Sequence, residues 1–90
     1  MKKGWKKQAS DALKAYPSNN PKINKAVEFA IRMQMEMYVD ADVRLHAMDL
    51  VYFRKTHTLR GAAMACDYSE KTVQQWNDSI LIAVYIGLTF

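Results

Sequence analysis

Apolar residues recur at intervals of three and four along most of this chain, the spacing of one face of an α-helix. No stretch alternates apolar and polar residues far enough to indicate a strand. The pattern predicts helices over about 6–16, 21–38 and 43–55, followed by a short helix, a turn and a longer helix after Thr58. We therefore expect an all-α fold, a small helical bundle with a C-terminal helix-turn-helix.

Local signals mark where these helices begin and end. Pro17 disfavours helical geometry at Tyr16, so the first helix should stop there. Asn20 and Pro21 suit the N-cap and the first turn of the second helix. Asp40 and Asp42 are each expected to cap the third helix rather than to bind a metal, because no further carboxylate lies at a calcium-loop spacing.

Two apolar stripes raise the question of what covers them. One stripe lies on the inner face of the second helix. Its methionines could form an adaptable contact surface or fill the core, and we expect them to fill the core. The last helix is apolar around nearly its whole circumference, so it is either central or paired with another chain, and we favour a homodimer. The stripes comprise Ile23, Ala26, Val27, Ala30, Met33 and Met37, with Met35 beside them, and Ile80, Leu81, Val84, Tyr85, Ile86, Leu88 and Phe90.

Ninety residues, half of them apolar, indicate one globular domain. Within it, 1–20 form a basic arm with a helix and linker, 21–56 two core helices, and 57–90 the helix-turn-helix with its long last helix. The single cysteine excludes an internal disulfide, and Cys66 has no zinc-site spacing to His46 or His57. We expect Cys66 to be a small core residue rather than a redox sensor, and we expect no metal and no cofactor.

The front of the chain carries the surplus of its net charge of +4. Up to Arg32 there are eight basic and two acidic residues, beginning with Lys2, Lys3, Lys6 and Lys7. A basic arm favours a polyanion such as nucleic acid, although it could equally be a solubilising tail. No secretory signal follows it, so we expect a cytoplasmic protein. The apolar run at 80–88 is too short to span a membrane.

The segment from Thr58 to Ile80 has the residue types that a helix-turn-helix requires. Ala63 is small where the two helices approach, and Asp67 falls where the turn takes left-handed geometry. Tyr68 is the apolar residue of the turn, and Ser69 suits the N-cap of the second helix. Any two amphipathic helices joined by a tight turn would look similar. The inward positions are Leu59, Cys66, Val73 and Trp76.

With those positions inward, the second helix turns an amide-rich face outward. Glutamine can pair with adenine, lysine with guanine or phosphate, and glutamate with the cytosine amino group. The outward residues are Glu70, Lys71, Gln74, Gln75 and Asp78.

The two stretches 59–63 and 67–73 resemble the helix-turn-helix of sigma-factor region 4, and the helix before them, 44–53, is similar to the one that precedes that motif. Residues 12–16 before a proline-bearing linker, with Trp76, Ile80, Val84, Gly87 and Leu88, resemble the small phage-encoded regulators of the RinA and ArpU type. The resemblance implies a DNA-binding activator of phage late genes in a bacterial host. It makes Ser69, Glu70, Lys71, Gln74 and Gln75 the base contacts and Arg60 and Thr72 phosphate contacts. Asp67 departs from the usual turn glycine.

The sequence therefore predicts a transcription regulator that binds double-stranded DNA, with further phosphate contacts from Arg54, Lys55 and His57. The alternative is an interaction module that docks on RNA polymerase or another protein through the apolar last helix. An enzyme is disfavoured, because no paired-carboxylate, nucleophile–base or phosphate-loop spacing occurs and both histidines are expected at the surface.

Overall fold

The computed structural model describes residues 3–90, so Lys2 of the basic arm lies outside the described residues. The described chain contains five α-helices and no strand, which confirms the predicted all-α class. The helices are α1 (Trp5–Ala15), α2 (Pro21–Met37), α3 (Ala41–Met48), α4 (Leu59–Cys66) and α5 (Glu70–Thr89), with a π-helical segment, η1 (Asp49–Phe53), after α3.

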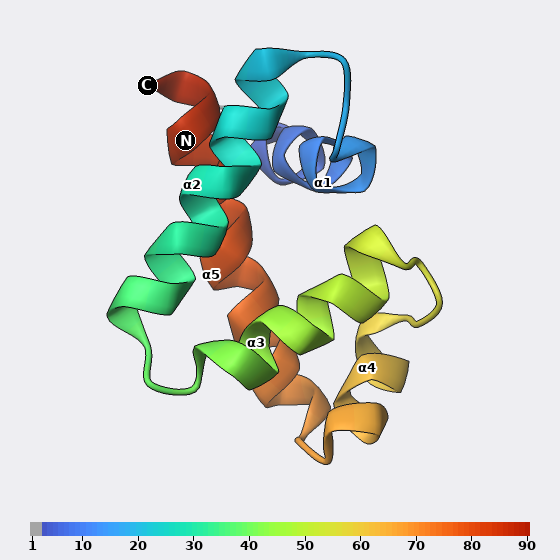
Figure 1. The fold of residues 1–90 in the computed structure, drawn as a ribbon. Coiled ribbons are helices and arrows are strands. Elements are labelled where there is room, and N and C mark those ends of the chain that lie inside the picture. The colour runs from blue at the N-terminus through green and yellow to red at the C-terminus, as the bar shows by residue number, and fades with distance from the viewer. Residues whose placement is uncertain (1–2) are drawn as a thin grey trace.

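Helix α5 lies at the centre of the molecule, and α1, α2, α3 and α4 all pack against it (Figure 1). In this view α2 runs beside α5 in the opposite direction, α1 crosses near the C-terminal end of α5, and α3 and α4 pack near its N-terminal end. Val73, Ile80 and Val84 are fully buried along α5. The central position accounts for much of the apolar circumference of this helix, since neighbours cover it from several sides.

Small residues let α2 and α5 approach closely. A Cβ atom added at Gly87 would lie 2.8 Å from the Ala26 Cα, closer than real side chains come to a backbone. Further along the pair, the buried Gln34 donates from Nε2 to the Ser79 hydroxyl at 3.3 Å, and the Tyr38 hydroxyl lies 3.4 Å from the same oxygen. Gln34 was not predicted to be inward, and its partner Ser79 is what makes its burial tolerable.

The prediction that the methionines of α2 fill the core is wrong for Met35 and Met37, whose exposed fractions are 64% and 62%. Ala26, Val27 and Ala30 are buried as predicted. The buried arc of α2 is narrow because the close approach to α5 is made by small residues, which leaves longer side chains at the rim. Met33 lies at that rim and is half-buried.

The predicted N-cap of α2 is confirmed, whereas the predicted N-cap of α3 is wrong. The Asn20 side chain accepts a hydrogen bond from the Lys22 N–H at 3.0 Å, which confirms the cap of α2. Asp40 stands at the cap position of α3 without making a cap hydrogen bond, and Asp42 lies inside the first turn, so the prediction that either caps this helix is wrong. The Asp40 carboxylate instead accepts from Arg44 Nε at 2.8 Å, because the nearby guanidinium supplies a charged donor.

The third predicted helix changes character before its end. The Arg54 N–H donates to the Asp49 carbonyl at 2.8 Å, a π-helical bond that spans five residues. Leu50 and Tyr52 are buried in this segment, and the Tyr52 hydroxyl donates to the Asn77 side chain of α5. Burial is the main cause that raises the pKa of Tyr52. The hydrogen bond between Tyr52 and Asn77 thus joins η1 to α5.

Candidate nucleic-acid interface

Three residues, Asp67, Tyr68 and Ser69, connect α4 to α5. Asp67 has φ 61° and ψ 43°, which confirms the left-handed geometry predicted there. The N–H groups of Asp67 and Tyr68 donate back to α4 carbonyls, at 3.3 Å to Met64 and 2.9 Å to Ala63. These bonds close the end of α4 and turn the chain sharply into α5.

The start of α5 is fixed by a pair of hydroxyl groups. The Ser69 hydroxyl oxygen accepts from the Thr72 N–H at 3.1 Å, which confirms the predicted cap. The same hydroxyl donates to Thr72 Oγ1 at 2.8 Å. Both hydrogen bonds hold the Ser69 hydroxyl at the helix end. Within residues 3–90 the O–H of the half-buried Thr72 donates to no other group.

Buried contacts set the rotation of α5 about its own axis. Val73 is fully buried and Trp76 is 4% exposed, as the spacing predicted, and Ala62 and Ala63 of α4 are buried with them. The Tyr68 ring packs edge-on against Trp76, with ring centroids 4.8 Å apart. These contacts decide which residues on the first two turns of α5 must face solvent.

The outward face of those turns carries unengaged polar groups. All four of its residues are exposed, and within residues 3–90 none of their side chains makes a hydrogen bond or an ion pair. They offer two amides, one cation and one carboxylate on a rigid helix. The four residues, which we call the α5 polar face, are Glu70, Lys71, Gln74 and Gln75.

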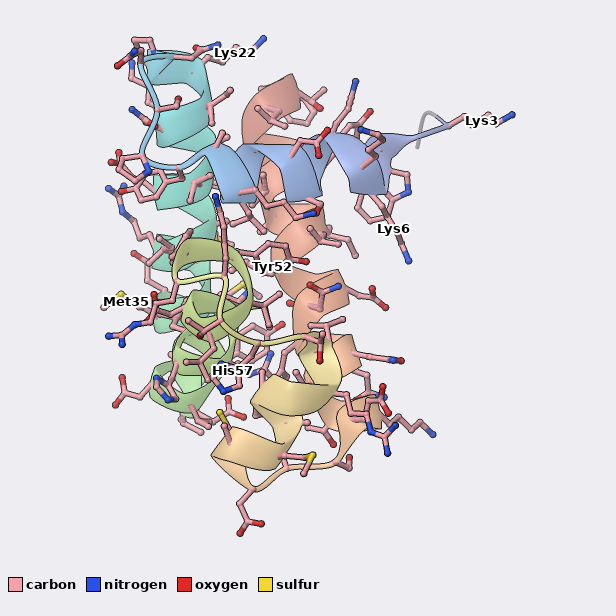
Figure 2. The ribbon with its side chains drawn as sticks, turned by 90° about the vertical axis from the view of Figure 1, so that its right-hand side faces the viewer. Lys3, Lys6, Lys22, Met35, Tyr52 and His57 are labelled. Carbon is pink, nitrogen blue, oxygen red and sulfur yellow. The ribbon has the colours of Figure 1, made fainter. Side chains whose placement is uncertain are left out.

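The N-terminal end of α1 lies beside this helix, a neighbour that the sequence did not predict. Lys6 Nζ is 3.6 Å from an Asp78 carboxylate oxygen, and Asp78 stands one turn beyond Gln74 on α5. Trp5 also packs on Tyr85, with ring centroids 5.7 Å apart. Figure 2 shows Lys3 and Lys6 at the end of α1 that projects past α5. The salt bridge offsets part of the charge of Asp78 and places the Lys6 side chain near the α5 polar face.

Apart from Thr72, the predicted phosphate contacts fall into two groups. Arg60 is exposed on α4, while Arg54, Lys55 and His57 are exposed in the connection that leads into α4. Arg54 donates from Nε to Asp49 at 2.9 Å, so part of its charge is balanced locally. The His57 ring lies against Gly61, where a Cβ atom would meet the ring at 3.5 Å.

Other chemistry is limited in the described part of the chain. No group of three metal-ligating side chains occurs within residues 3–90. No helix described there is long and apolar enough to cross a membrane. Cys66, predicted to be a small core residue, is half-buried and packs against the core. Burial raises the pKa of its thiol, which favours the protonated form.

Comparisons of the chain with protein-family models, with curated proteins and with solved structures gave no match. The resemblance to sigma-factor region 4 and to the RinA and ArpU regulators therefore stays a prediction from the residues that carry it. Function must be inferred from the exposed chemistry of α4 and α5 and from what surrounds them.

Proposed function

We propose that this protein is a sequence-specific regulator of transcription that binds double-stranded DNA, with α4 and the start of α5 acting as a helix-turn-helix. The observation that carries the proposal is the α5 polar face, which is exposed and unengaged on a helix whose rotation is fixed by Val73 and Trp76. A helix presented in this way suits entry into the major groove, where base edges differ in their donors and acceptors.

Each group on the α5 polar face has a matching base edge. Gln74 and Gln75 can pair bidentately with adenine, Lys71 can donate to guanine, and Glu70 can accept from cytosine. Ser69, which the resemblance assigns to base contact, also holds the helix start in place. Phosphate contacts would come from the free O–H of Thr72 and from Arg54, Lys55, His57, Arg60 and the lysines at the start of α1.

The wider proposal rests on the resemblance for the late-gene role and the bacterial host, and on the residue spacing for the lack of enzymatic chemistry. It holds that the regulator activates phage late genes in the cytoplasm of a bacterial host and that it acts as a binding protein without cofactors rather than as an enzyme.

Selection of binding sites from random double-stranded DNA with the purified chain tests the proposal. We expect one enriched sequence whose affinity falls steeply with salt, because released counterions drive phosphate binding. Lys71→Ala combined with Gln75→Ala should abolish discrimination between sites. The matched control removes the same residue types from α1, with Gln8→Ala and Lys14→Ala, and should leave discrimination intact. Absence of binding, or binding that salt does not weaken, would contradict the proposal.

A second candidate function is docking on RNA polymerase or another protein. It is favoured by the apolar residues that α5 leaves exposed beyond the polar face, Ile82, Ile86 and Phe90. Binding of purified polymerase that is lost in Ile86→Glu, in a chain without DNA affinity, would replace the first proposal with this one. The predicted homodimer is the other use of the same residues.

A further inference from the structure

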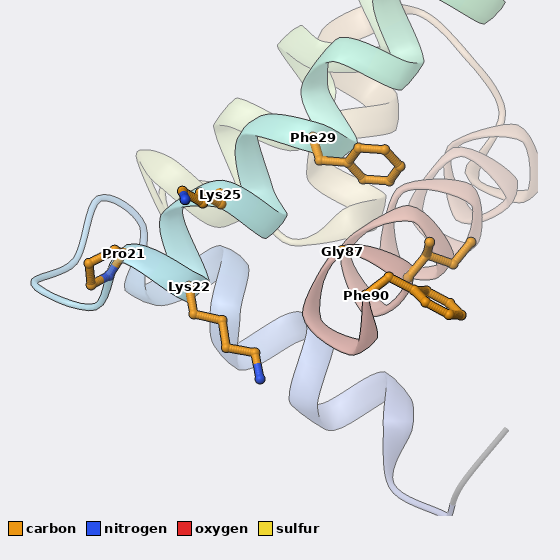
Figure 3. A pocket seen from close by; sticks show the side chains of 7 residues that line it. Pro21, Lys22, Lys25, Phe29, Gly87 and Phe90 are labelled. Carbon is orange, nitrogen blue, oxygen red and sulfur yellow. The ribbon is translucent and has the colours of Figure 1, made fainter.

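One outer flank of the α2–α5 pair carries an uncovered apolar strip. On each helix its members are spaced by four residues, so they line up along that helix. Met37 is 62% exposed, Phe90 98%, and Ile82 and Ile86 are each exposed by more than a third. Figure 3 shows Phe29 and Phe90 on either side of one end of the strip. The strip consists of Phe29, Met33 and Met37 of α2, Ile82 and Ile86 of α5, and Phe90 at the C-cap of α5, and we call it the α2/α5 strip.

The antiparallel packing of the two helices fixes the middle of the strip. Gly87 lies level with Ala26, and Ser79 lies level with Gln34. Phe90 therefore stands at one end and Met37 at the other, with Ile82 and Ile86 on either side of the midpoint.

Charge changes sign from one end of the strip to the other. Lys22 and Lys25 line the hollow formed by Phe29, Ile86 and Phe90. At the other end, Glu36 and Asp42 line a hollow with Met37 and Tyr38. Within residues 3–90 none of these four charged side chains makes an ion pair. Arg32, the other cation of α2, lines a hollow with Tyr16, Glu28 and Ile31, and Glu36 borders that hollow as well as the one beside Met37.

Because the strip carries opposite charges at its two ends, two copies that run antiparallel place opposite charges against each other. We propose that a second copy of this chain covers the α2/α5 strip in an antiparallel two-fold dimer. In this arrangement Lys25 of one copy faces Glu36 of the other, and Lys22 faces the acidic end that includes Asp42. A parallel arrangement would set lysine against lysine and carboxylate against carboxylate, which like-charge repulsion disfavours.

This dimer has a consequence for DNA that rests on the proposed function, whereas the dimer itself does not. The two α5 helices run side by side in opposite directions, with the two-fold axis near the level of Ala83. The centre of the α5 polar face is about 11 residues from that level, so at 1.5 Å per residue the two faces are about 33 Å apart. That separation is close to one turn of B-DNA, roughly 34 Å, the half-site spacing of two-fold helix-turn-helix dimers. We expect a palindromic site with half-site centres one turn apart.

Sedimentation equilibrium of the full chain without DNA tests the dimer, so its outcome does not depend on the proposed function. We expect a dimer at micromolar concentration that Ile86→Glu converts to monomer. Lys25→Glu and Glu36→Lys should each weaken the dimer by about tenfold, because each places two like-charge pairs across the interface. The double variant should restore it, and a mixture of the two single variants should form a mixed dimer. Lys14→Glu, an exposed charge reversal on α1, is the control and should change nothing.

Circular dichroism and thermal melts of each variant distinguish loss of association from loss of folding. A wild-type chain that stays monomeric at 100-fold higher concentration would overturn the proposal, even if polymerase or another protein binds the strip. A dimer that survives Ile86→Glu would also overturn it. Single charge reversals that do not weaken the dimer would overturn the antiparallel arrangement. A dimer that fails to prefer half-sites one turn apart over half-sites one and a half turns apart would overturn the spacing.

Discussion

The two halves of α5 share one inner face and differ in their outer faces. In the first two turns the outer residues are polar and unengaged, while Val73 and Trp76 point inward. In the second half Ile80 and Val84 point inward, and Ile82 and Ile86, each exposed by more than a third, make the outer face apolar as well. One helix thus serves the fold along its whole length and offers a different surface at each end.

Folding and recognition are thus separated by position on the helix. Inner substitutions should damage the whole molecule, whichever half they occupy. Outer substitutions should leave stability nearly unchanged and should affect DNA binding in the first half and self-association in the second.

Trp76→Ala should have the largest effect, because it empties the packing beneath the polar face. Trp76 is 4% exposed and contacts Tyr68, and Arg44 lies over its ring at 5.6 Å. We expect the free energy of unfolding to fall by about 3–5 kcal/mol, measured by urea denaturation. A loss below about 1 kcal/mol would show that the inner face is not shared in the way described.

Gly87→Ala tests the inner face of the second half. The added methyl group would meet the Ala26 backbone at 2.8 Å, so α2 and α5 must separate. We expect a loss of about 1–3 kcal/mol in the free energy of unfolding. Gly61→Ala is the matched control: its nearest contact is 3.4 Å, and it should be neutral or gain up to about 1 kcal/mol. Equal effects at the two glycines would contradict the close approach.

Lys71→Ala and Gln75→Ala, made separately, test the outer face of the first half. Each should cost about 1–3 kcal/mol of binding free energy on the selected DNA site. The free energy of unfolding should stay within about 0.5 kcal/mol of the wild type, because both residues are exposed and unbonded. Isothermal titration paired with urea denaturation measures both quantities. A variant that loses both stability and DNA binding would contradict the separation of folding from recognition on α5.

Ser69→Ala should have a smaller effect, confined to the start of α5. It removes the acceptor for the Thr72 N–H, and we expect a loss of about 1 kcal/mol in the free energy of unfolding. Ser69→Asp keeps a cap acceptor and should recover most of that loss. Failure of aspartate to rescue would indicate that the hydroxyl has a role other than capping.

Asp67→Gly should have the smallest effect and the opposite sign. Aspartate holds φ 61° at the end of α4, a conformation that glycine adopts with less strain. We expect the chain to gain about 0.5–1 kcal/mol in the free energy of unfolding. Thermal melts check this, and a loss of stability would mean that the Asp67 side chain contributes to the turn.

Features with short-range causes could be predicted from the sequence. The Asn20 and Ser69 caps, the left-handed Asp67 and the inward Val73 and Trp76 depend on neighbours within one or two turns. The exposure of the four residues of the α5 polar face follows from those inward positions by helical periodicity.

Features that depend on partners distant in the sequence could not be predicted. Gln34 is buried because Ser79 of α5 lies across from it. The contact of Lys6 with Asp78, which places one basic side chain near the polar face, joins residues that are far apart in the sequence. No local pattern specifies any of these pairings.

The central claim is that the α5 polar face distinguishes DNA sequences. The most direct test measures the DNA affinity of wild type and of the double variant Lys71→Ala/Gln75→Ala. Each protein is titrated against the selected site and against a scrambled duplex, at several salt concentrations. We expect wild type to prefer the selected site by about 10³-fold or more. We expect the variant to bind both duplexes equally, weakly and with a salt dependence like that of wild type on the scrambled duplex. Equal affinity of wild type for the two duplexes, or an unchanged preference in the variant, would contradict the claim.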